Sequence, residues 1–258
     1  MDKKVKIVML VGISESSKIV YNFISKDFNI VKVIEDTPVS RKIFFKKRIK
    51  KIGFYKVFGQ ILFIIYNIVF LKKQSNRRIE EIKNRYSLLT KFYPDEVFIK
   101  VKSANNKETI DALKTINPDI VLVNGTRIIS ERVLTSIDAV FINTHVGITP
   151  SYRGVHGGYW SLVNNDHKNC GVTVHLVDKG IDTGGVLYQD IIEIEKKDNF
   201  NTYPFLQLAK ALPLIGKALN DSIKDKIIVK KGKNKESKLY THPTLLEYIK
   251  FKLLYKVK

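Results

Sequence analysis

Short apolar runs alternate with segments of helical spacing along most of this chain. The run VKIVMLV, residues 5–11, ends at Gly12 and suits a strand that is buried on both faces. Residues 14–28 begin with serines that favour a helix N-terminus and then carry apolar residues at helical spacing. Residues 29–36, NIVKVIED, return to a strand pattern. This strand–helix–strand order predicts a βαβ unit and therefore a parallel sheet.

The alternation resumes near residue 95 and defines the expected fold. Further strands are predicted at residues 95–103, 118–125, 138–145, 170–178, 185–194 and 226–232, and further helices at residues 106–117, 127–137, 156–166 and 202–223. We expect an α/β, Rossmann-like fold with a mostly parallel sheet and flanking helices. The main domain is expected over residues 1–205, with a basic helical insertion at residues 40–84. Residues 206–258 are expected to form a short C-terminal appendage of helix, strand and basic tail.

Composition places the chain among ordinary globular proteins. Hydrophobic residues make up 44% and charged residues 27% of the 258 residues, and no repeat of fixed period is present. The single cysteine, Cys170, excludes an intramolecular disulfide and fits a reducing cytosol. The N-terminal apolar run lacks the cleavage pattern of a signal peptide, so we expect a cytoplasmic protein.

The insertion carries much of an unusual positive charge. The chain has 45 Lys and Arg against 25 Asp and Glu, and its net charge of +20 favours anionic partners. Between Arg41 and Ile79 there are 12 basic residues and no acidic residue. The apolar run at residues 57–71 is shorter than the roughly 20 residues that a membrane-spanning helix needs.

Three interpretations of the insertion are open from sequence. Its helices pack on the domain as a pair, or they bind an anionic membrane surface peripherally through residues 41–78. The third interpretation is a nucleic-acid patch, which we do not expect because no recognition motif accompanies the charge.

Two polar side chains close the predicted strand at residues 138–145. In an open parallel sheet, ligands bind outside the carboxyl ends of the strands. Asn143 and His145 are two residues apart, so both side chains point to one face of the strand. Together they suit stabilisation of a developing oxyanion and transfer of a proton. The alternative is an ordinary strand end with two satisfied polar groups.

A carboxylate is expected to complete this group. The loop DKGIDTGG, residues 178–185, follows a strand and supplies Asp178 and Asp182. A carboxylate next to a histidine orients the ring, changes its pKa or relays a proton through water. Gly184 and Gly185 allow the backbone to approach a ligand closely. An ordinary loop remains the alternative for this segment.

The spacing of these motifs resembles that of the 10-formyltetrahydrofolate-dependent formyltransferases. The resemblance rests on Asn-x-His at a strand end, on TPSYRG (residues 149–154) after it, and on GVTVHLVDKGIDTGG (residues 171–185) further on. It is clear from Pro118 to Gln189 and looser over the first strand, helix and strand. This family includes glycinamide ribonucleotide transformylase, methionyl-tRNA formyltransferase and the sugar N-formyltransferases.

The resemblance implies a role for each residue of the group. Asn143 and protonated His145 stabilise the oxyanion that forms when a primary amine attacks the formyl carbon, and Asp182 aligns His145 and carries the amine proton through a water. The resemblance also implies that the segment NGTRIIS, residues 124–130, borders the folate site and that residues 177–181 close it. The candidate folate-binding residues are Arg127, Ile128, Ile129, Val177, Asp178 and Ile181. For Ile128 and Ile129 a plain core position is the alternative.

The acceptor amine is expected to meet the loop after His145. The candidate acceptor-binding residues are Tyr152, Arg153, Gly154, His156 and Trp160. For His156 and Trp160, packing is the alternative. His175 alternates with apolar neighbours and is interpreted as a residue on the polar face of its strand.

We expect the acceptor to be an amino group on a nucleotide-linked sugar for a surface polysaccharide. Methionyl-tRNA formyltransferases carry an additional C-terminal barrel domain, for which few residues remain here. Glycinamide ribonucleotide transformylases lack an analogous insertion at residues 40–84, yet that acceptor stays an alternative, as do hydrolysis of formyltetrahydrofolate and a non-catalytic binding protein with this fold. The expected location is the cytoplasm, peripheral to the inner face of the membrane, and a homodimer is among the expected assemblies.

Other patterns for chemistry are weaker. His145, His156, His175 and Cys170 lack the close-paired spacing of metal ligands, and the family needs no metal, so none is expected. The segment GISESS, residues 12–17, lacks the second glycine of a nucleophile elbow, although its helix N-terminus suits an anion. No dinucleotide-binding glycine motif follows the first strand.

Overall fold

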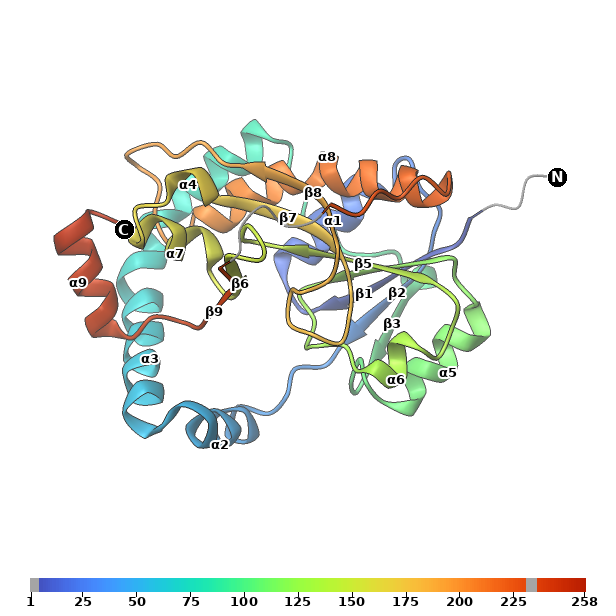
Figure 1. Ribbon diagram of the computed structural model, residues 1–258, viewed down its shortest axis with the longest axis horizontal. Helices are drawn as coiled ribbons and strands as arrows, with labels where there is room; N and C mark the ends of the chain where they lie inside the picture. The colour runs from blue at the N-terminus through green and yellow to red at the C-terminus, as the bar shows by residue number, and fades with distance from the viewer. Residues whose placement is uncertain (1–4, 231–235) are drawn as a thin grey trace.

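A computed structural model of the chain describes residues 5–230 and 236–258. Its centre is a seven-stranded sheet in the order β3-β2-β1-β4-β5-β7-β8 (Figure 1). The strands are β1 (Ile7–Gly12), β2 (Ile30–Asp36), β3 (Phe98–Val101), β4 (Ile120–Asn124), β5 (Val140–His145), β7 (Gly171–Leu176) and β8 (Val186–Ile191). The first five strands pair in parallel, and the β5–β7 and β7–β8 pairs are antiparallel. The sheet confirms the expected Rossmann-like fold class.

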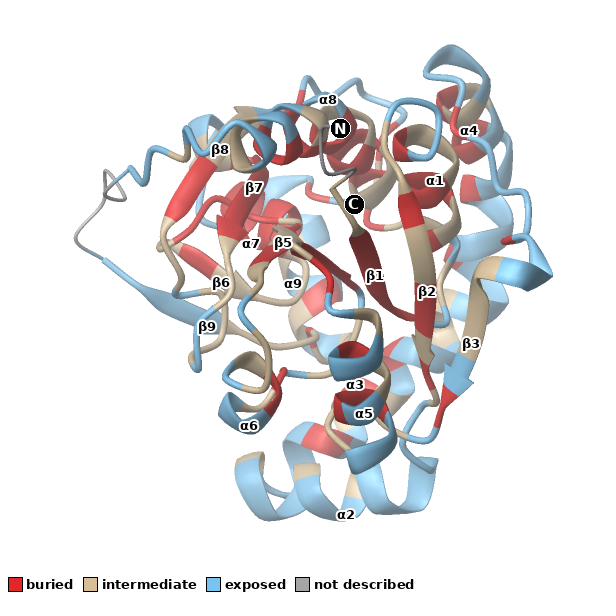
Figure 2. Cartoon of the chain, turned by 90° about the vertical axis from the view of Figure 1, so that its right-hand side faces the viewer, coloured by how far each residue is buried: buried red, intermediate tan, exposed pale blue. Residues whose placement is uncertain are grey.

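Helices cover both faces of this sheet (Figure 1). The first face carries α1 (Glu15–Ile24), α7 (Gly157–Val163) and α8 (Tyr203–Ile223), and the second carries α5 (Lys107–Ile116) and α6 (Glu131–Leu134). Alternate residues of a strand point to opposite faces, so β1 adds Ile7 and Met9 to one core and Val8 and Leu10 to the other. The central strands are therefore buried along their length (Figure 2).

The order of the strands reverses between β1 and β4, and this reversal creates a crevice for ligands at their carboxyl ends. The loops that leave these two strands approach each other closely. A Cβ at Gly12 would lie 2.1 Å from the carbonyl oxygen of Gly125, so only glycine fits at that crossing. Strand β5 lies next to β4 and ends at the same edge.

The expected insertion is helical throughout its length. It consists of α2 (Arg41–Ile52), α3 (Phe54–Tyr66), the π-helical turn η1 (Asn67–Leu71) and α4 (Lys72–Arg85). From Phe54 to Arg85 these helices follow one another without a break, and by length and composition alone this stretch is able to cross a membrane. Helix α2 contains no buried residue and lies at the edge of the molecule (Figure 2).

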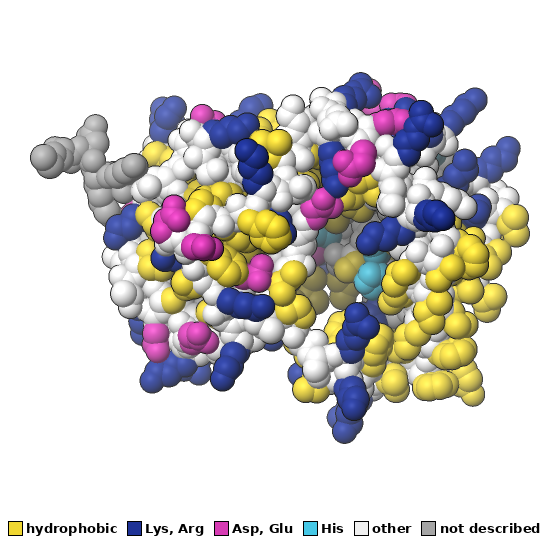
Figure 3. Space-filling model, turned by 180° about the vertical axis from the view of Figure 1, so that it is seen from behind, with side chains coloured by type: hydrophobic (Ala, Val, Ile, Leu, Met, Phe, Trp, Pro, Cys, Tyr) yellow, Lys and Arg dark blue, Asp and Glu magenta, His cyan; other side chains and the backbone are white. Residues whose placement is uncertain are grey.

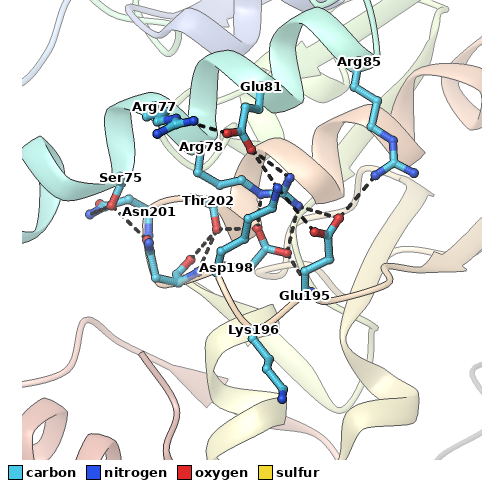
Figure 4. A network of polar contacts seen from close by, with 12 residues as sticks. Ser75, Arg77, Arg78, Glu81, Arg85, Glu195, Lys196, Asp198, Asn201 and Thr202 are labelled. Atoms are coloured by element: carbon cyan, nitrogen blue, oxygen red, sulfur yellow. Dashed lines mark hydrogen bonds and ion pairs between the residues drawn. The ribbon is translucent and has the colours of Figure 1, made fainter.

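A buried ion pair fastens α4 to the segment before α8 (Figure 4). Nε of Arg78 lies 2.7 Å from Oδ1 of Asp198, whose side chain is fully buried. Glu195 joins the same guanidinium at 3.0 Å. The polar half of the long helix is thereby fixed to the domain.

The last part of the chain returns to the segment that follows β5. A short strand β9 (Lys238–Tyr240) pairs in parallel with β6 (Tyr152–Gly154), and α9 (Leu245–Tyr255) packs beside α3. Helix α9 begins with a capping box between Thr244 and Glu247.

Two expected elements were wrong in extent. The helix expected at residues 127–137 is reduced to α6, because residues 127–130 are held by contacts to loops instead. The strand expected at residues 226–232 does not form over residues 226–229, and only an isolated bridge joins Lys230 to Val186. Residues 231 and 232 lie outside the described residues. Ile228 and Val229 are exposed, so their β-propensity finds no partner strand.

Candidate active site

Asn143 and His145 lie at the carboxyl end of β5, next to the crevice between β1 and β4. His145 is buried, and its Nε2 donates to the carbonyl oxygen of Tyr152 at 2.6 Å. Asn143 is half-buried, and its Nδ2 lies 3.2 Å from Nε2 of His175. The predicted pair is therefore positioned by the strand, and each member has a specific polar neighbour.

Asp182 reaches His145 from the loop between β7 and β8. Its Oδ2 lies 3.3 Å from Nδ1 of His145 and accepts a hydrogen bond of 2.9 Å from the backbone N–H of Gly154. The φ angle of Asp182 is 51°, in the left-handed region that Asp tolerates better than most residues. Folding thus brings Asn143, His145 and Asp182 together, as the sequence predicts.

His175 belongs to the same group, although its pattern in the sequence indicates only the polar face of a strand. It faces Asn143 directly across the β5–β7 pair, and its Nε2 is 3.7 Å from Oδ1 of Asp182. Its Nδ1 lies 2.7 Å from the carbonyl oxygen of Leu176, and this contact orients the ring so that Nε2 faces Asn143. The orientation of the Asn143 amide is therefore set by His175.

Burial and charge determine the resting protonation of the group. Burial lowers the pKa of His145 below its ordinary value of 6.5, and the attraction of Asp182 offsets only part of this effect. Burial acts to raise the pKa of Asp182, but the contacts from His175, His145 and the Gly154 N–H outweigh it, so the pKa is lowered. At neutral pH an ionised carboxylate faces an unprotonated Nδ1. The resemblance implies a protonated His145, which is therefore absent from the resting site and forms only when Nδ1 takes up a proton.

The loop after His145 is held close to the ring. A Cβ at Gly147 would lie 2.6 Å from Nε2 of His145 and 2.4 Å from the carbonyl oxygen of Tyr152. The peptide bond between Thr149 and Pro150 is cis, and the loop ends in β6 and the start of α7. A side chain at Gly147 would displace the hydrogen bond that orients His145.

The candidate acceptor residues separate into two groups. Tyr152 is buried, and its hydroxyl donates to Asp166. Gly154 and Arg153 lie against the loop between β7 and β8, because the Gly154 N–H donates to Asp182 and Nη1 of Arg153 donates to the carbonyl oxygen of Ile181. The buried Nε of Arg153 has no hydrogen-bond partner among the described residues. Arg153 therefore has a donor without a described partner directly next to Tyr152, whose carbonyl oxygen accepts from His145.

His156 and Trp160 contact a segment that the sequence pattern did not connect to the site. Nε2 of His156 lies 2.9 Å from Nδ1 of His242, and Nε1 of Trp160 donates to the carbonyl oxygen of Thr241. Burial lowers the pKa of His156 to about 3 and that of His242 to about 4. Both rings are therefore neutral at physiological pH.

Arg48 reaches this histidine pair from α2. Its Nε donates to Gln60, which in turn donates to the carbonyl oxygen of His242. The buried Nη2 of Arg48 has no hydrogen-bond partner among the residues that the structure describes. The insertion thus contributes a guanidinium with an unused donor beside His242. This contact could not be predicted from the sequence, because Gln60 and His242 are 182 residues apart.

The candidate folate residues lie at the ends of β4 and β7. Arg127 forms an ion pair with Asp36 at 2.7 Å, and Asp178 accepts from the Gly180 N–H and the Thr183 hydroxyl. Ile128 is exposed, whereas Ile129 is buried in the core below the sheet. Val177 is fixed by its N–H to the carbonyl oxygen of Phe141. Of the two isoleucines, therefore, only Ile128 offers its side chain to a ligand.

Other features of the described chain are structural. A cavity of about 630 Å³ is lined in part by Tyr152 of β6 and Tyr240 of β9, but by none of Asn143, His145 and Asp182. Ser14 caps α1, and Ser16 donates to Asn124. Within residues 5–230 and 236–258, no group of three or more His, Cys, Asp and Glu side chains is arranged to hold a metal ion.

Comparison with known proteins agrees with this geometry. The Formyl transferase family model matches residues 56–204, more than half of the chain. A methionyl-tRNA formyltransferase from Caldanaerobacter subterraneus subsp. tengcongensis is 32% identical over 134 residues, which are 52% of this chain and 43% of that protein. The chain thus spans less than half the length of this relative.

Solved structures of low sequence identity share the fold. A sugar N-formyltransferase from Shewanella sp FDAARGOS_354 has a TM-score of 0.57 at 13% identity, with 96% of this chain and 87% of that chain covered. For glycinamide ribonucleotide transformylase 1 from Symbiobacterium toebii the TM-score is 0.59 at 15% identity, with 90% and 93% covered. WlaRD, a sugar 3N-formyl transferase solved in the presence of dTDP and 5-N-formyl-THF, has a TM-score of 0.54 at 18% identity, with 92% and 70% covered. From the matched family model and the geometry at the end of β5, we conclude that the chain belongs to the formyl transferase family.

Proposed function

We propose that this protein is an N-formyltransferase that moves a formyl group from 10-formyltetrahydrofolate to a primary amine. The observation that carries the proposal is the meeting of Asn143, His145 and Asp182 at the carboxyl end of β5. Membership of the formyl transferase family supports the formyl donor. The reaction needs a hydrogen-bond donor to the oxyanion, which Asn143 supplies. It also needs a proton acceptor and a carboxylate beside it, which His145 and Asp182 supply.

Each residue has one task in this mechanism. The amine attacks the formyl carbon, and a new C–N bond forms while the formyl oxygen gains negative charge. Asn143 turns its Nδ2 from His175 to that oxygen and donates a hydrogen bond. The ionised Asp182 accepts the amine proton through a water and shares it with Nδ1 of His145. The protonated pair returns it to the leaving folate nitrogen as the old C–N bond breaks.

We propose that the six candidate folate residues hold the donor beside this group. They occupy the loops that follow β4 and β7, the two strands that pair with β5. The exposed side chain of Ile128 and the backbone of residues 177–181 are suited to a flat ring, because a ring buries apolar area while backbone groups satisfy its polar edge.

We propose an amino group on a nucleotide-linked sugar as the acceptor. The unused guanidinium donors of Arg153 and Arg48 suit the phosphates of a nucleotide. Two of the similar folds belong to sugar formyltransferases, one of them solved with dTDP. Formylation of such a sugar before its use in a surface polysaccharide would take place in the cytoplasm, at the inner face of the membrane. A homodimer is the assembly that we propose for the protein.

The experiment is an assay of tetrahydrofolate release with 10-formyltetrahydrofolate and a panel of amines. We expect turnover with a dTDP- or UDP-linked amino sugar. Turnover only with glycinamide ribonucleotide or with methionyl-tRNA would overturn the sugar acceptor and keep the formyl transfer. Formate release without any amine would identify a hydrolase, and no reaction of the donor under any condition would contradict formyl transfer itself.

A further inference from the structure

An exposed apolar face runs along α3 and continues onto α9. On α3 and η1 its large side chains recur at helical spacing; they are Phe54, Phe58, Leu62, Ile65 and Val69. On α9 the exposed members are Leu246, Ile249 and Leu253. The two helices pack against each other, and Figure 3 shows hydrophobic side chains gathered over this side of the molecule.

The opposite side of α3 is packed on the domain. Val57, Gln60 and Phe63 are buried, and the Phe63 ring meets those of Phe200 and Tyr248. The exposed face is therefore a second apolar face of a helix that is already anchored. Large exposed apolar faces in soluble proteins mark surfaces that bind a partner or a membrane.

Basic side chains flank this face. Helix α2, directly before α3, exposes Lys42, Lys46, Lys47, Lys50 and Lys51, and none of them forms an ion pair with a residue that the structure describes. Lys56 and Lys250 are also exposed beside the apolar residues. No acidic residue occurs between Arg41 and Ile79. A surface with apolar side chains in the middle and unpaired lysines around it complements an anionic lipid surface.

We propose that the face formed by α3 and α9, with the lysines of α2, docks this protein peripherally on an anionic membrane. Its apolar side chains enter the boundary between headgroups and acyl chains, and the lysines bind lipid phosphates. Charge argues against a second copy as the occupant, because a symmetric pairing through this face would bring two lysine-rich α2 helices together.

The packing of the long helix, Phe54–Arg85, keeps it from crossing the membrane on which it docks. By length and composition alone this helix is able to cross a membrane, but one face of α3 is packed on the domain through Phe63. The part that follows, α4, is polar and is fastened by the Arg78–Asp198 ion pair. The helix therefore lies on the membrane while its inner face remains part of the domain.

Flotation of the full chain with vesicles tests the proposal. We expect binding to phosphatidylcholine vesicles with about a quarter phosphatidylglycerol, weak binding to phosphatidylcholine alone, and release as salt screens the lysines. Lys46, Lys47, Lys50 and Lys51 changed together to Gln should reduce binding by roughly 600-fold, because each of the four charges near the surface contributes roughly fivefold. Arg48 is kept in this variant because of its contact with Gln60.

Matched variants separate docking from general charge and from folding. Lys100, Lys102, Lys107 and Lys114, in and around β3 and α5 and outside the proposed face, changed to Gln, remove the same charge and should bind as the parent chain does. Phe58→Gln with Leu62→Gln should weaken binding and leave formyl transfer in solution unchanged, whereas Phe92→Gln, at another exposed aromatic, should leave binding unchanged.

Three results would overturn the proposal. They are equal loss of binding in both lysine variants, a stable dimer in the parent chain that Phe58→Gln dissociates, and membrane association that resists both high salt and alkaline carbonate. The second would assign the face to another copy of the chain, and the third would indicate insertion across the bilayer. Activity in solution is measured separately, so failure of docking does not bear on formyl transfer.

Discussion

The amide of Asn143 is the strongest single candidate for oxyanion stabilisation. Its Nδ2 lies 3.2 Å from Nε2 of His175 in the resting site, and we expect it to exchange this contact for one to a developing charge. We predict that Asn143→Ala lowers kcat by about 10²- to 10³-fold, as removal of one oxyanion donor does in other acyl transfer sites. Steady-state release of tetrahydrofolate measures this change. Asn76→Ala, on the exposed surface of α4, is the control and should retain full activity.

In the proposed mechanism His175 is a positioning residue, because it contacts Asn143 and Asp182 rather than the reacting atoms. We predict that His175→Phe lowers kcat about tenfold or more, and that His175→Gln, which keeps a hydrogen-bonding group, restores part of the loss. Removal of His175 also removes an interaction that lowers the pKa of Asp182. The acid limb of the kcat/KM profile should therefore move to higher pH in His175→Phe. An unchanged limb with an equal loss in both variants would indicate a role in packing alone.

At the scale of single residues, local spacing predicts which side chains share a face of one element, but not which side chains meet across elements. Asn143 and His145 share a face because they are two apart in a strand, and the family motif around Asp182 identifies its loop. His175 was missed because its partner lies in another strand, and the β5–β7 register is set by the folded sheet. The contacts of Arg48 with Gln60 and of His156 with His242 were missed for the same reason.

At the scale of elements, the attachment of α4 depends on one buried charge pair. The side chain of Asp198 is fully buried against Arg78, and it also accepts from the backbone N–H of Glu195. We predict that Asp198→Ala lowers the free energy of unfolding by about 3–5 kcal/mol, because it leaves the guanidinium buried without its main partner. Urea denaturation measures the loss. Arg77→Ala breaks only an exposed pair on the same helix, and a change of about 0.5 kcal/mol or less is expected there.

The elements themselves were predictable where the pattern is long and strongly periodic. The buried strands β1, β4 and β5 and the helix α8 appear at their expected positions, even though Pro213 lies inside α8. The expected strand at residues 226–232 was wrong, since β-branched residues form a strand only where a neighbouring strand is available. Nor does periodicity reveal that α3, η1 and α4 join into one helix, because the π turn shifts its phase.

At the scale of the whole molecule, the site is assembled from segments that are far apart in the chain. Strand β5, the loop before β8, helix α2 and the segment before α9 all contribute a polar group. Three of the histidines gathered in this way, His145, His156 and His242, have a pKa that burial lowers. The fold therefore holds these rings neutral, and its stability becomes linked to pH.

The sign of this linkage follows from which state binds protons first. Each of these histidines takes up a proton near pH 6.5 in the unfolded chain but only at lower pH in the folded one. Their contribution to the free energy of unfolding is therefore fully present above about pH 7. It falls as the pH decreases from about 6.5 toward 4, by up to about 1.4 kcal/mol per pH unit for each histidine. The lowered pKa of Asp182 adds a separate loss only below about pH 4.

The double variant His156→Gln, His242→Asn isolates this effect, because the two amides occupy the positions of the ring nitrogens that face each other. We predict that its free energy of unfolding, from urea titrations at pH 7, 6 and 5, falls less steeply than that of the parent chain. His167→Gln, at an exposed histidine, should leave the parent slope unchanged. An equal slope in the double variant would place the acid sensitivity elsewhere in the fold, because these two rings would then bind protons alike in the folded and unfolded chains.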